Sequence, residues 1–365
     1  MRAAVLEGAG QPICIHDDVS IAEPRAGQVR VAVSHCGVCH SDLSIADGVF
    51  PAPLPIVLGH EAAGVVEAVG PGVTGLAPGD SVILTPAPPC GRCYWCVRGE
   101  AALCADAAGI VTNTFADGST GLARGAAKVF RGLNLGAFAE RVVCTESAAV
   151  KVPRDVPLDV ACVIGCAVQT GVGAVLNTAR VPEGATVLVM GLGGIGLSAV
   201  QGARIAGAAR IFASDPLAER RKAAESFGAT DLLDPNADDV AARVREATGV
   251  GADYAFETAG RASLVAVGLA ATRNGGTVVC VGAPPIHEKI EIAPAALFAV
   301  TEKKLLGCIL GSSNSLREIP RLVSLWRAGR LDLEALITQR RPLAEINQAM
   351  ADLRAGRGVR TVLAI

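Results

Sequence analysis

The sequence predicts an α/β protein built from two parts, one a strongly bent β structure and the other a doubly wound parallel sheet. The chain has 365 residues, which exceeds one typical core and suggests about two domains. Residues 1–160 read as short strands broken by Gly and Pro, whereas strands alternate with helix-compatible runs from about residue 184. Such alternation is typical of a parallel sheet with helices on both faces.

Composition narrows the class of protein. Hydrophobic residues make up 51% of the chain and charged residues 19%, enough for a large packed core. A formal net charge of −2 offers no extended basic surface, so we expect no nucleic-acid partner. Residues 1–7 lack the pattern of a signal peptide, and we expect a cytoplasmic protein.

One uncharged stretch, residues 160–179, is long enough to span a bilayer. It includes cysteines, glycines, Gln169 and Asn177, whereas a lipid-facing helix would hold more Leu, Ile and Phe. We therefore predict a buried segment of a soluble protein and no membrane partner.

The individual elements follow from periodicity and from breakers. Residues 29–33 alternate apolar and polar side chains, as a half-buried strand does, and prolines such as Pro51, Pro55 and Pro78 mark the loops. In the second part, strands are predicted at 185–190, 209–214, 231–233, 253–257 and 277–281. The predicted helices there are a run ending at 206, then 216–227, 240–247 and 264–271. In the tail, helices are predicted at 316–328 and 343–353 and a closing strand at 359–363.

A glycine-rich motif follows the first of these strands: Gly191-Leu192-Gly193-Gly194-Ile195-Gly196. A G-x-G-x-x-G is weak evidence by itself in a chain with 42 glycines, but this one joins a predicted strand to a predicted helix. The glycines permit a tight turn, close approach of a pyrophosphate and close packing of helix on strand, and the helix N-terminus attracts phosphates. The motif therefore predicts a dinucleotide site.

Asp215, at the end of the next predicted strand, indicates which dinucleotide binds. Its carboxylate can accept both ribose hydroxyls, whereas a 2′-phosphate would meet like charge. Residues 216–218 supply no cation to offset that charge. We expect NAD rather than NADP, and a solvated carboxylate at a strand end is the alternative interpretation of Asp215.

The twelve cysteines cluster along the chain, and without an export signal such thiols indicate metal or catalytic sites rather than disulfides. Four of them form C-x2-C-x2-C-x7-C: Cys90, Cys93, Cys96 and Cys104. Four thiolates in one short loop can close a tetrahedron around zinc and leave no position open. The loop is therefore predicted to hold a structural metal, with an iron–sulfur cluster as the alternative.

A second set of possible ligands is dispersed. Cys39 lies in a Gly-Val-Cys-His-Ser-Asp run, His60 in Gly-His-Glu, and Cys166 in Gly-Cys-x-x-x-Thr-Gly. Two thiolates and one imidazole leave a fourth tetrahedral position for water or substrate, the arrangement of catalytic zinc. Spacing alone does not separate this trio from ordinary core or surface side chains.

With the four-cysteine loop, the glycine fingerprint and a closing Gly-x-x-x-Arg-Thr at 356–361, these motifs resemble a known family. The chain is similar to zinc-containing medium-chain dehydrogenases, in the alcohol dehydrogenase and glutathione-dependent formaldehyde dehydrogenase group, over nearly its whole length. The resemblance implies a GroES-like catalytic domain of residues 1–165 and 312–365, a Rossmann NAD-binding domain of residues 166–311, and a catalytic cleft between them. It also implies a homodimer, joined through a strand such as 304–310, with a tetramer as the alternative.

The resemblance implies two zinc ions per chain. The matching catalytic zinc ligands are Cys39, His60 and Cys166, and the matching structural ligands are Cys90, Cys93, Cys96 and Cys104. Asp42 matches the carboxylate that orients the zinc-bound imidazole, and Glu61 an acidic neighbour that approaches the metal during ligand exchange. Other cysteines have no motif and are expected to be buried fillers: Cys14, Cys36, Cys144, Cys162, Cys280 and Cys308.

The resemblance also implies the contacts of NAD. His40 and Arg360 match pyrophosphate contacts, Thr170 lies where the nicotinamide is held, and Val281 where its carboxamide meets the backbone. The remaining cofactor residues are Gly191, Gly193, Gly194, Ile195, Gly196, Asp215 and Arg220.

The implied reaction is reversible hydride transfer between a primary alcohol and NAD. Zinc lowers the pKa of the alcohol, Ser41 receives its proton, and the nicotinamide accepts hydride. Many relatives carry a His three residues after the relay hydroxyl, where this chain has Ser44. The proton must then leave by another route, through His40 or water.

The expected substrate pocket is apolar. Phe50 stands where formaldehyde dehydrogenases of this group carry an acidic residue, Pro86 replaces a pocket aromatic, and Leu133 lines the same cavity, although Phe50 could equally be loop packing. We expect aromatic or medium-chain primary alcohols. The alternatives are a thiol-dependent formaldehyde dehydrogenase, a reductase of activated C=C bonds, and a non-enzymatic nucleotide-binding or redox-sensing zinc protein. Ser41 and the complete ligand set disfavour the last two.

Overall fold

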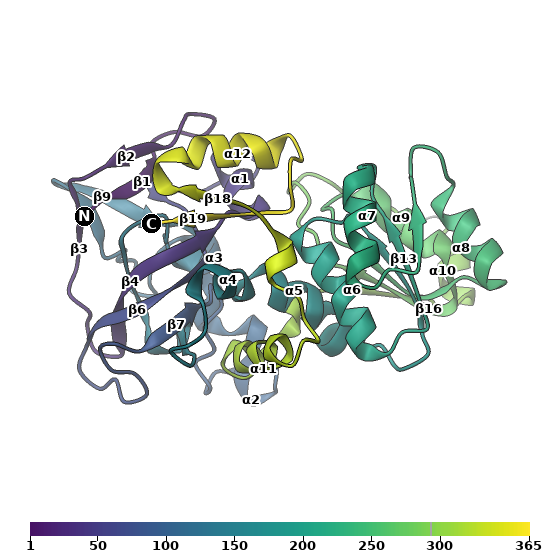
Figure 1. The fold of residues 1–365 in the computed structure, drawn as a ribbon, viewed down its shortest axis with the longest axis horizontal. Coiled ribbons are helices and arrows are strands. Elements are labelled where there is room, and N and C mark those ends of the chain that lie inside the picture. The colour runs from purple at the N-terminus through teal and green to yellow at the C-terminus, as the bar shows by residue number, and fades with distance from the viewer. Residues whose placement is uncertain (293) are drawn as a thin grey trace. The chain divides into compact units, whose positions relative to one another are not determined.

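A computed structural model describes residues 1–292 and 294–365 and divides the chain into two compact units. The first unit contains Met1–Ala167 and Asn314–Ile365, and the second contains Val168–Ser313 (Figure 1). The sequence had placed these boundaries two residues earlier at each junction. The prediction of an α/β chain with a β-rich part and a parallel-sheet part is confirmed.

The larger sheet of the first unit positions most of the polar side chains discussed below. Its central strand β4 (Gln28–Gly37) extends the predicted strand by one residue at its start and four at its end, and it is followed closely by α1 (His40–Ala46). Antiparallel partners flank it, β6 (Glu61–Val69) on one side and β19 (Arg360–Ala364) on the other. The order continues through β7 (Ser81–Leu84) and β11 (Ala149–Lys151) beyond β6, and β18 (Ile337–Pro342) beyond β19, while β10 (Arg141–Thr145) also pairs with β4.

A second sheet of the same unit has the strand order β2-β1-β5-β9-β8-β3. Its strands are β1 (Ala3–Leu6), β2 (Cys14–His16), β3 (Val19–Ile21), β5 (Ile56–Val57), β8 (Leu122–Arg124) and β9 (Ala127–Arg131). Apolar side chains from both sheets and from their connections form one buried cluster, which includes Val5 of β1, Val31 of β4 and Phe138. The bent β structure predicted from the dense Gly and Pro punctuation is thus two sheets around a common core.

The second unit is a six-stranded sheet in which every neighbouring pair is parallel. The order is β14 (Asp231–Leu233), β13 (Arg210–Ser214), β12 (Thr186–Met190), β15 (Ala252–Glu257), β16 (Thr272–Cys280) and β17 (Lys304–Gly307). The connecting helices are α6 (Gly194–Ala206), α7 (Ala218–Phe227), α8 (Val240–Thr248), α9 (Ala262–Ala271) and α10 (Ala295–Val300). Chain order reverses at β12 and β15, and ligands bind at such a switch point in open α/β sheets.

Two predicted strands have different bounds in the structure. β16 begins at Thr272, five residues earlier than predicted, because its first residue still pairs with Ala252 before an irregularity in register. The expected strand 304–310 ends at Gly307. The chain leaves the extended conformation after Ile309, since Leu310, Gly311 and Ser312 all have positive φ.

The uncharged stretch 160–179 forms several short helical pieces rather than one helix. They are α4 (Leu158–Ala161), a 3₁₀ turn (Cys162–Gly165), α5 (Ala167–Gly173) and a π-helical segment (Ala174–Ala179). Among the described residues no single helix has the length and apolarity needed to cross a membrane. One pair of helical segments, Leu158–Gly165 with Ala167–Ala179, passes that test jointly but is bent by 53° at its break.

In the tail, α11 (Ser315–Arg327) and α12 (Ile346–Arg354) precede the closing strand β19. The predicted helix 343–353 begins with a 3₁₀ turn, Leu343–Glu345, and becomes α-helical only at Ile346. Both helices belong to the first unit, so the C-terminal segment returns to the domain that the N-terminus begins (Figure 1).

Candidate metal centres and dinucleotide site

The four-cysteine loop forms a compact sulfur cluster. The Sγ atoms of Cys90, Cys93, Cys96 and Cys104 all lie within 4.8 Å of one another. Backbone N–H groups support them, with Cys90 N donating to Cys104 Sγ at 3.2 Å and Cys93 N to Cys90 Sγ at 3.3 Å. Backbone donors at Ala105 and Cys96 lower the pKa of the Cys93 thiol to about 6. Four sulfurs at these separations fit one tetrahedral metal ion and leave no vertex for a substrate.

The dispersed ligands also converge. Cys39 is the N-cap residue of α1, His60 immediately precedes β6, and Cys166 lies between the 3₁₀ turn and α5. One ligand atom from each, together with a carboxylate oxygen of Glu61, lies within 4.8 Å of the others, and all four residues are buried. A hydrogen bond from Cys166 holds the pKa of the Cys39 thiol well below its ordinary value. This set also fits a metal ion, and it offers only two sulfurs and one imidazole.

Asp42 organises this cluster from the first turn of α1. Its Oδ2 accepts a hydrogen bond from Cys39 N at 3.1 Å, and its Oδ1 accepts from Gly59 N at 2.9 Å and lies 3.2 Å from His60 Nδ1. Burial works against a charge on His60, but the adjacent Asp42 and Cys39 raise the pKa of the imidazole well above its ordinary value. Because Asp42 engages Nδ1, the ring turns Nε2 toward the other ligands.

Glu61 is the polar group that the surrounding chain leaves least satisfied. Neither carboxylate oxygen has a hydrogen-bond partner among the described residues, although Arg360 Nη2 lies 3.3 Å from Oε1. Burial raises the pKa of Glu61 to about 8, and Arg360 opposes that rise. A buried carboxylate oxygen without a donor, beside two cysteines and a histidine, is the arrangement that a cation would complete.

Gly37 is a contributor that sequence reasoning missed. A Cβ placed there would lie 2.5 Å from Glu61 Oε2, so any side chain would displace the carboxylate. The glycine two residues before Cys39 could have served as a signal, because glycine admits close approach of another group.

The predicted proton acceptor and its neighbour differ in exposure. Ser41 is half-buried, and its Oγ lies 4.0 Å from Cys39 Sγ, at the edge of the ligand cluster. His40, the first residue of α1, is exposed. Ser44 is also on α1 and half-buried, and its carbonyl accepts from Phe50 N at 3.0 Å.

In the second unit, glycine is favoured at Gly191, Gly193 and Gly196 for three different physical reasons. Gly191 follows β12 with φ of +92°, and a Cβ there would lie 2.8 Å from Ala259 Cβ. A Cβ on Gly196 would lie 1.8 Å from the Gly191 carbonyl oxygen, so the helix could not approach the turn. Gly193, the N-cap residue of α6, has no heavy atom within 4 Å of a built Cβ. That open space is where a pyrophosphate could approach the N–H groups of Gly194 and Ile195.

Asp215 is buried at the end of β13 and braces the fingerprint turn. Its Oδ2 accepts from Leu192 N at 2.8 Å and its Oδ1 from Leu217 N at 2.9 Å. Residues 216–218 supply no cation, as the sequence indicated, but helix α7 brings two arginines close to Asp215, the expected cofactor residue Arg220 and its neighbour Arg221. Arg220 Nη1 lies 4.0 Å from Asp215 Oδ2, and Arg221 Nη1 donates to the Asp215 carbonyl at 2.6 Å.

The residues assigned to the nicotinamide are buried in the same unit. Thr170 is on α5, and a Cβ on the following Gly171 would lie 2.3 Å from the Ile195 carbonyl, so α5 packs tightly on α6. Val281 N donates to Glu257 O at 2.8 Å, directly after β16.

Residues 308–312 form a segment that sequence reasoning missed. The segment packs against both the end of β16, beside Val281, and helix α5, which carries Thr170. Cys308 N donates to Cys280 O at 3.0 Å, and a Cβ on Gly311 would lie 2.3 Å from the Gln169 carbonyl. Three consecutive positive φ values allow this route, and only the single glycine among them hinted at it.

The proposed pocket residues all belong to the first unit. Pro86 and Leu133 are buried, and the Pro86 carbonyl accepts from the side-chain amide of Asn134, next to Leu133, at 2.9 Å. Phe50 is half-buried and packs on the main core of that unit, so its loop-packing alternative also stands. One expectation about cysteines is wrong: Cys14 is exposed on the edge strand β2, and Cys280 and Cys308 are only partly buried.

The first unit has a four-sulfur set and a buried set of two cysteines, one histidine and Glu61, and the second unit has a glycine fingerprint on a parallel sheet. Together these features define a class of protein, the metal-dependent dehydrogenases. Family models agree. Residues 25–154 match the alcohol dehydrogenase GroES-like domain, and residues 194–325 match the zinc-binding dehydrogenase domain.

Individual proteins resemble the chain over its full length. It is 40% identical to an NDMA-dependent alcohol dehydrogenase of Amycolatopsis methanolica, covering 99% of this chain and 98% of the relative. A solved alcohol dehydrogenase zinc-binding domain protein from Burkholderia ambifaria has 38% identity and a TM-score of 0.95, with 100% and 98% of the two chains covered. Benzyl alcohol dehydrogenase from Acinetobacter calcoaceticus has 32% identity and a TM-score of 0.94, with 100% and 99% covered.

The chain therefore belongs to the zinc-containing medium-chain dehydrogenase family and is a zinc-dependent alcohol dehydrogenase. The comparisons bear out the family and the fold predicted from the sequence, and the formaldehyde dehydrogenase branch has no specific support.

Proposed function

We propose that the enzyme oxidises aromatic or medium-chain primary alcohols with NAD and reduces the matching aldehydes. The observation that carries this proposal is the buried Cys39, His60 and Cys166 cluster, with the Ser41 hydroxyl at its edge. The names of two relatives, an alcohol dehydrogenase and a benzyl alcohol dehydrogenase, support the substrate class. The apolar side chains proposed for the pocket, Phe50, Pro86 and Leu133, offer no charge to an anionic substrate.

The chain's own residues suit alkoxide chemistry. When bound, zinc supplies the Lewis acidity that lowers the pKa of an alcohol, and NAD supplies the hydride acceptor. The proposal assigns the substrate proton to Ser41, supported by the 4.0 Å between its Oγ and Cys39 Sγ and by a hydroxyl's capacity both to accept and to donate. Asp42 holds His60 in one orientation through the contact of its Oδ1 with Nδ1 of the imidazole.

Substrate class is tested by NADH formation with ethanol, hexanol, benzyl alcohol, and formaldehyde with and without glutathione. We expect rapid turnover of hexanol and benzyl alcohol, and loss of activity after treatment with a zinc chelator. Activity only with formaldehyde and thiol would replace the proposal with the thiol-dependent reaction. A parallel arm adds NDMA, because the name of one relative specifies it. If turnover requires NDMA, the proposed alcohol substrate stands, but the proposal that free NAD is the acceptor is rejected.

The preference for NAD is supported by the buried Asp215 carboxylate, which would meet a 2′-phosphate as like charge. Arg220, 4.0 Å away, weakens this argument without removing it. Replacing Asp215 with Gly should lower the ratio of kcat/KM for NAD to kcat/KM for NADP by about tenfold. Asp215→Asn is the matched control, since it removes the charge but keeps an acceptor for Leu192 N–H. An unchanged ratio in both variants would reject the assignment.

We also propose a homodimer that pairs through β17. This strand is at the edge of the parallel sheet, and an edge strand presents unpaired backbone groups to a second chain. Light scattering on the purified protein should give twice the monomer mass or a multiple of it. A monomer at micromolar concentration would reject the pairing.

A further inference from the structure

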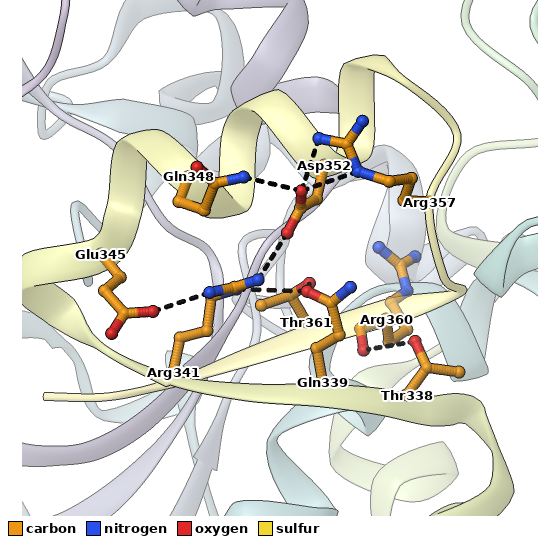
Figure 2. Close-up of polar contacts among 9 residues, drawn as sticks. All are labelled: Thr338, Gln339, Arg341, Glu345, Gln348, Asp352, Arg357, Arg360 and Thr361. Atoms are coloured by element: carbon orange, nitrogen blue, oxygen red, sulfur yellow. Dashed lines mark hydrogen bonds and ion pairs between the residues drawn. The ribbon is translucent and has the colours of Figure 1, made fainter.

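One buried carboxylate outside the metal centre gathers an unusual number of donors. Asp352, in the last turn of α12, is 3% exposed and accepts from three side chains (Figure 2). Arg341 Nη2 lies 2.7 Å from Oδ2, while Arg357 Nη2 at 2.7 Å, Arg357 Nε at 2.9 Å and Gln348 Nε2 at 2.9 Å converge on Oδ1. The Arg357 guanidinium holds the pKa of Asp352 below its ordinary value. Bonds from charged donors to a shielded carboxylate are stronger than exposed ion pairs.

These contacts tie three segments together. Arg341 comes from β18, Asp352 from α12, and Arg357 from the loop that leads to β19. Arg357 is bonded to Asp352 twice, because its backbone N–H also donates to the Asp352 carbonyl at 2.8 Å. The loop therefore has a fixed start as it leaves the helix.

The end of the loop is equally constrained. Val359 N donates to Thr338 Oγ1 at 2.9 Å, and Thr338 Oγ1 donates in turn to the Arg360 carbonyl at 3.3 Å (Figure 2). Gly358 has φ of +73°, and a Cβ there would lie 2.5 Å from Thr338 Oγ1. With both ends held, the few residues between Asp352 and Arg360 have little freedom.

Arg360 is the residue that this loop delivers to the candidate site. Its side chain is 4% exposed, its Nη1 donates to the Val38 carbonyl at 3.1 Å, and its Nη2 lies 3.3 Å from Glu61 Oε1. Both partners border the cluster that contains Cys39. A shift of the loop by a fraction of an ångström would change both contacts.

We propose that Asp352 is a positioning residue that sets the place of Arg360 and, through it, the affinity for the dinucleotide. Asp352 acts by clamping Arg357 and Arg341, and it touches neither the metal ligands nor the cofactor residues. The link to affinity rests on the proposed function, in which Arg360 contacts the pyrophosphate.

The test compares Asp352→Asn with Glu345→Gln. Asp352→Asn removes the charge that both arginines share, with little change in shape. Glu345→Gln is the matched control, because Glu345 bonds Arg341 at 2.7 Å on the side away from the loop. The dissociation constant of NAD should rise about tenfold in Asp352→Asn and stay unchanged in the control, as for other residues that support a ligand contact. The kcat at saturating NAD should be retained, whereas a purely structural role would lower kcat and leave KM for NAD unchanged, and that result would overturn the proposal.

A double-mutant cycle shows whether the effect passes through Arg360. In an Arg360→Lys background, Asp352→Asn should produce no further loss of NAD affinity. Additive losses would mean that the two residues act independently and would overturn the proposal.

A third readout does not depend on the dinucleotide. Amide hydrogen exchange at residues 357–361 should accelerate in Asp352→Asn and not in Glu345→Gln, because the clamp protects these amides. Equal protection in both variants would overturn the clamp. Failure of the wild-type protein to bind any dinucleotide would instead reject the proposed function, and the exchange result would still decide the role of Asp352.

Discussion

The two metal-ligand clusters of this enzyme are built in opposite ways. The cysteine loop collects its four sulfurs from residues 90–104, where three of the cysteines are half-buried and Cys104 is buried, with backbone N–H groups as their support. The buried cluster collects its ligands from segments as distant as Cys39 and Cys166 and surrounds them with charged side chains, Asp42, Glu61 and Arg360. The loop would fill every position of a bound zinc ion, whereas the buried cluster would hold zinc through Cys39, His60 and Cys166 and leave the fourth position to Glu61 or to a substrate.

The largest effect is expected from the loss of His60, a ligand of the buried cluster. Replacing His60 with Ala removes a ligand and leaves Asp42 without its imidazole partner. Turnover of benzyl alcohol should fall by about a thousandfold, since the Lewis acid accounts for several kcal/mol of stabilisation in the transition state. Zinc content, measured by mass spectrometry of metals, should fall from two equivalents to one. Retention of both zinc ions with normal turnover would contradict the assignment.

A smaller loss is expected when the support of the imidazole is removed while its ligand atom stays. Asp42→Asn removes the charge beside His60 and can keep only one of the two hydrogen bonds from Gly59 N and Cys39 N, because an amide has a single acceptor oxygen. Metal affinity or activity should fall by about 10- to 100-fold, as is usual for residues that orient a metal ligand. Competition with a chromogenic chelator measures the affinity. A loss confined to thermal stability would show that Asp42 only caps α1.

Loss of a ligand in the cysteine loop should affect stability rather than activity, unlike the substitutions at His60 and Asp42. Cys96→Ala opens the sulfur cluster, so the loop should lose its ion and the thermal midpoint should fall by about 5 °C or more. Activity of the surviving folded enzyme should stay within a few-fold of wild type, because no substrate position is lost. Calorimetry and kinetics on the same preparation test this, with Cys14→Ala, an exposed cysteine outside both clusters, as the control. Loss of activity as complete as in His60→Ala would erase the distinction between the sites.

The smallest expected effect is a pH dependence of thiol reactivity in the cysteine loop. In chelator-treated protein, the Cys93 thiol has a pKa of about 6, because backbone N–H groups bond its sulfur. Its alkylation by iodoacetamide should therefore remain fast at neutral pH and slow as the pH falls through about 6, since only the thiolate reacts. Cys144 is the control, because it is buried and burial raises the pKa of its thiol to about 12. Peptide mapping that showed equal labelling of the two would contradict this account.

The comparison also explains what could be predicted from sequence. The loop ligands are neighbours along the chain, so spacing alone indicated a metal site. The buried ligands lie together only after β4, β6 and the turn before α5 have packed, and resemblance to a family was needed to group them. The glycine fingerprint could be recognised from sequence because Gly191 and Gly196 each meet a local backbone requirement.

Other features had no local signature. Arg220 was expected near the cofactor only through the family resemblance, and the hydrogen bond of Arg221 to the Asp215 carbonyl follows from the packing of α7, which no local pattern indicates. Likewise, Asp352 looks like any helical acid in the sequence, and its burial and partners follow only from the packing of α12 against β18. Side chains whose environment comes from distant segments are those that sequence patterns describe least well.

Zinc-edge anomalous diffraction on crystals of the purified enzyme tests the central contrast most directly. The account predicts two zinc peaks, one bound by Cys90, Cys93, Cys96 and Cys104, the other by Cys39, His60 and Cys166 with an additional ligand that is not one of these side chains. A single peak in the cysteine loop, or four protein ligands closing the buried site in every substrate complex, would contradict it.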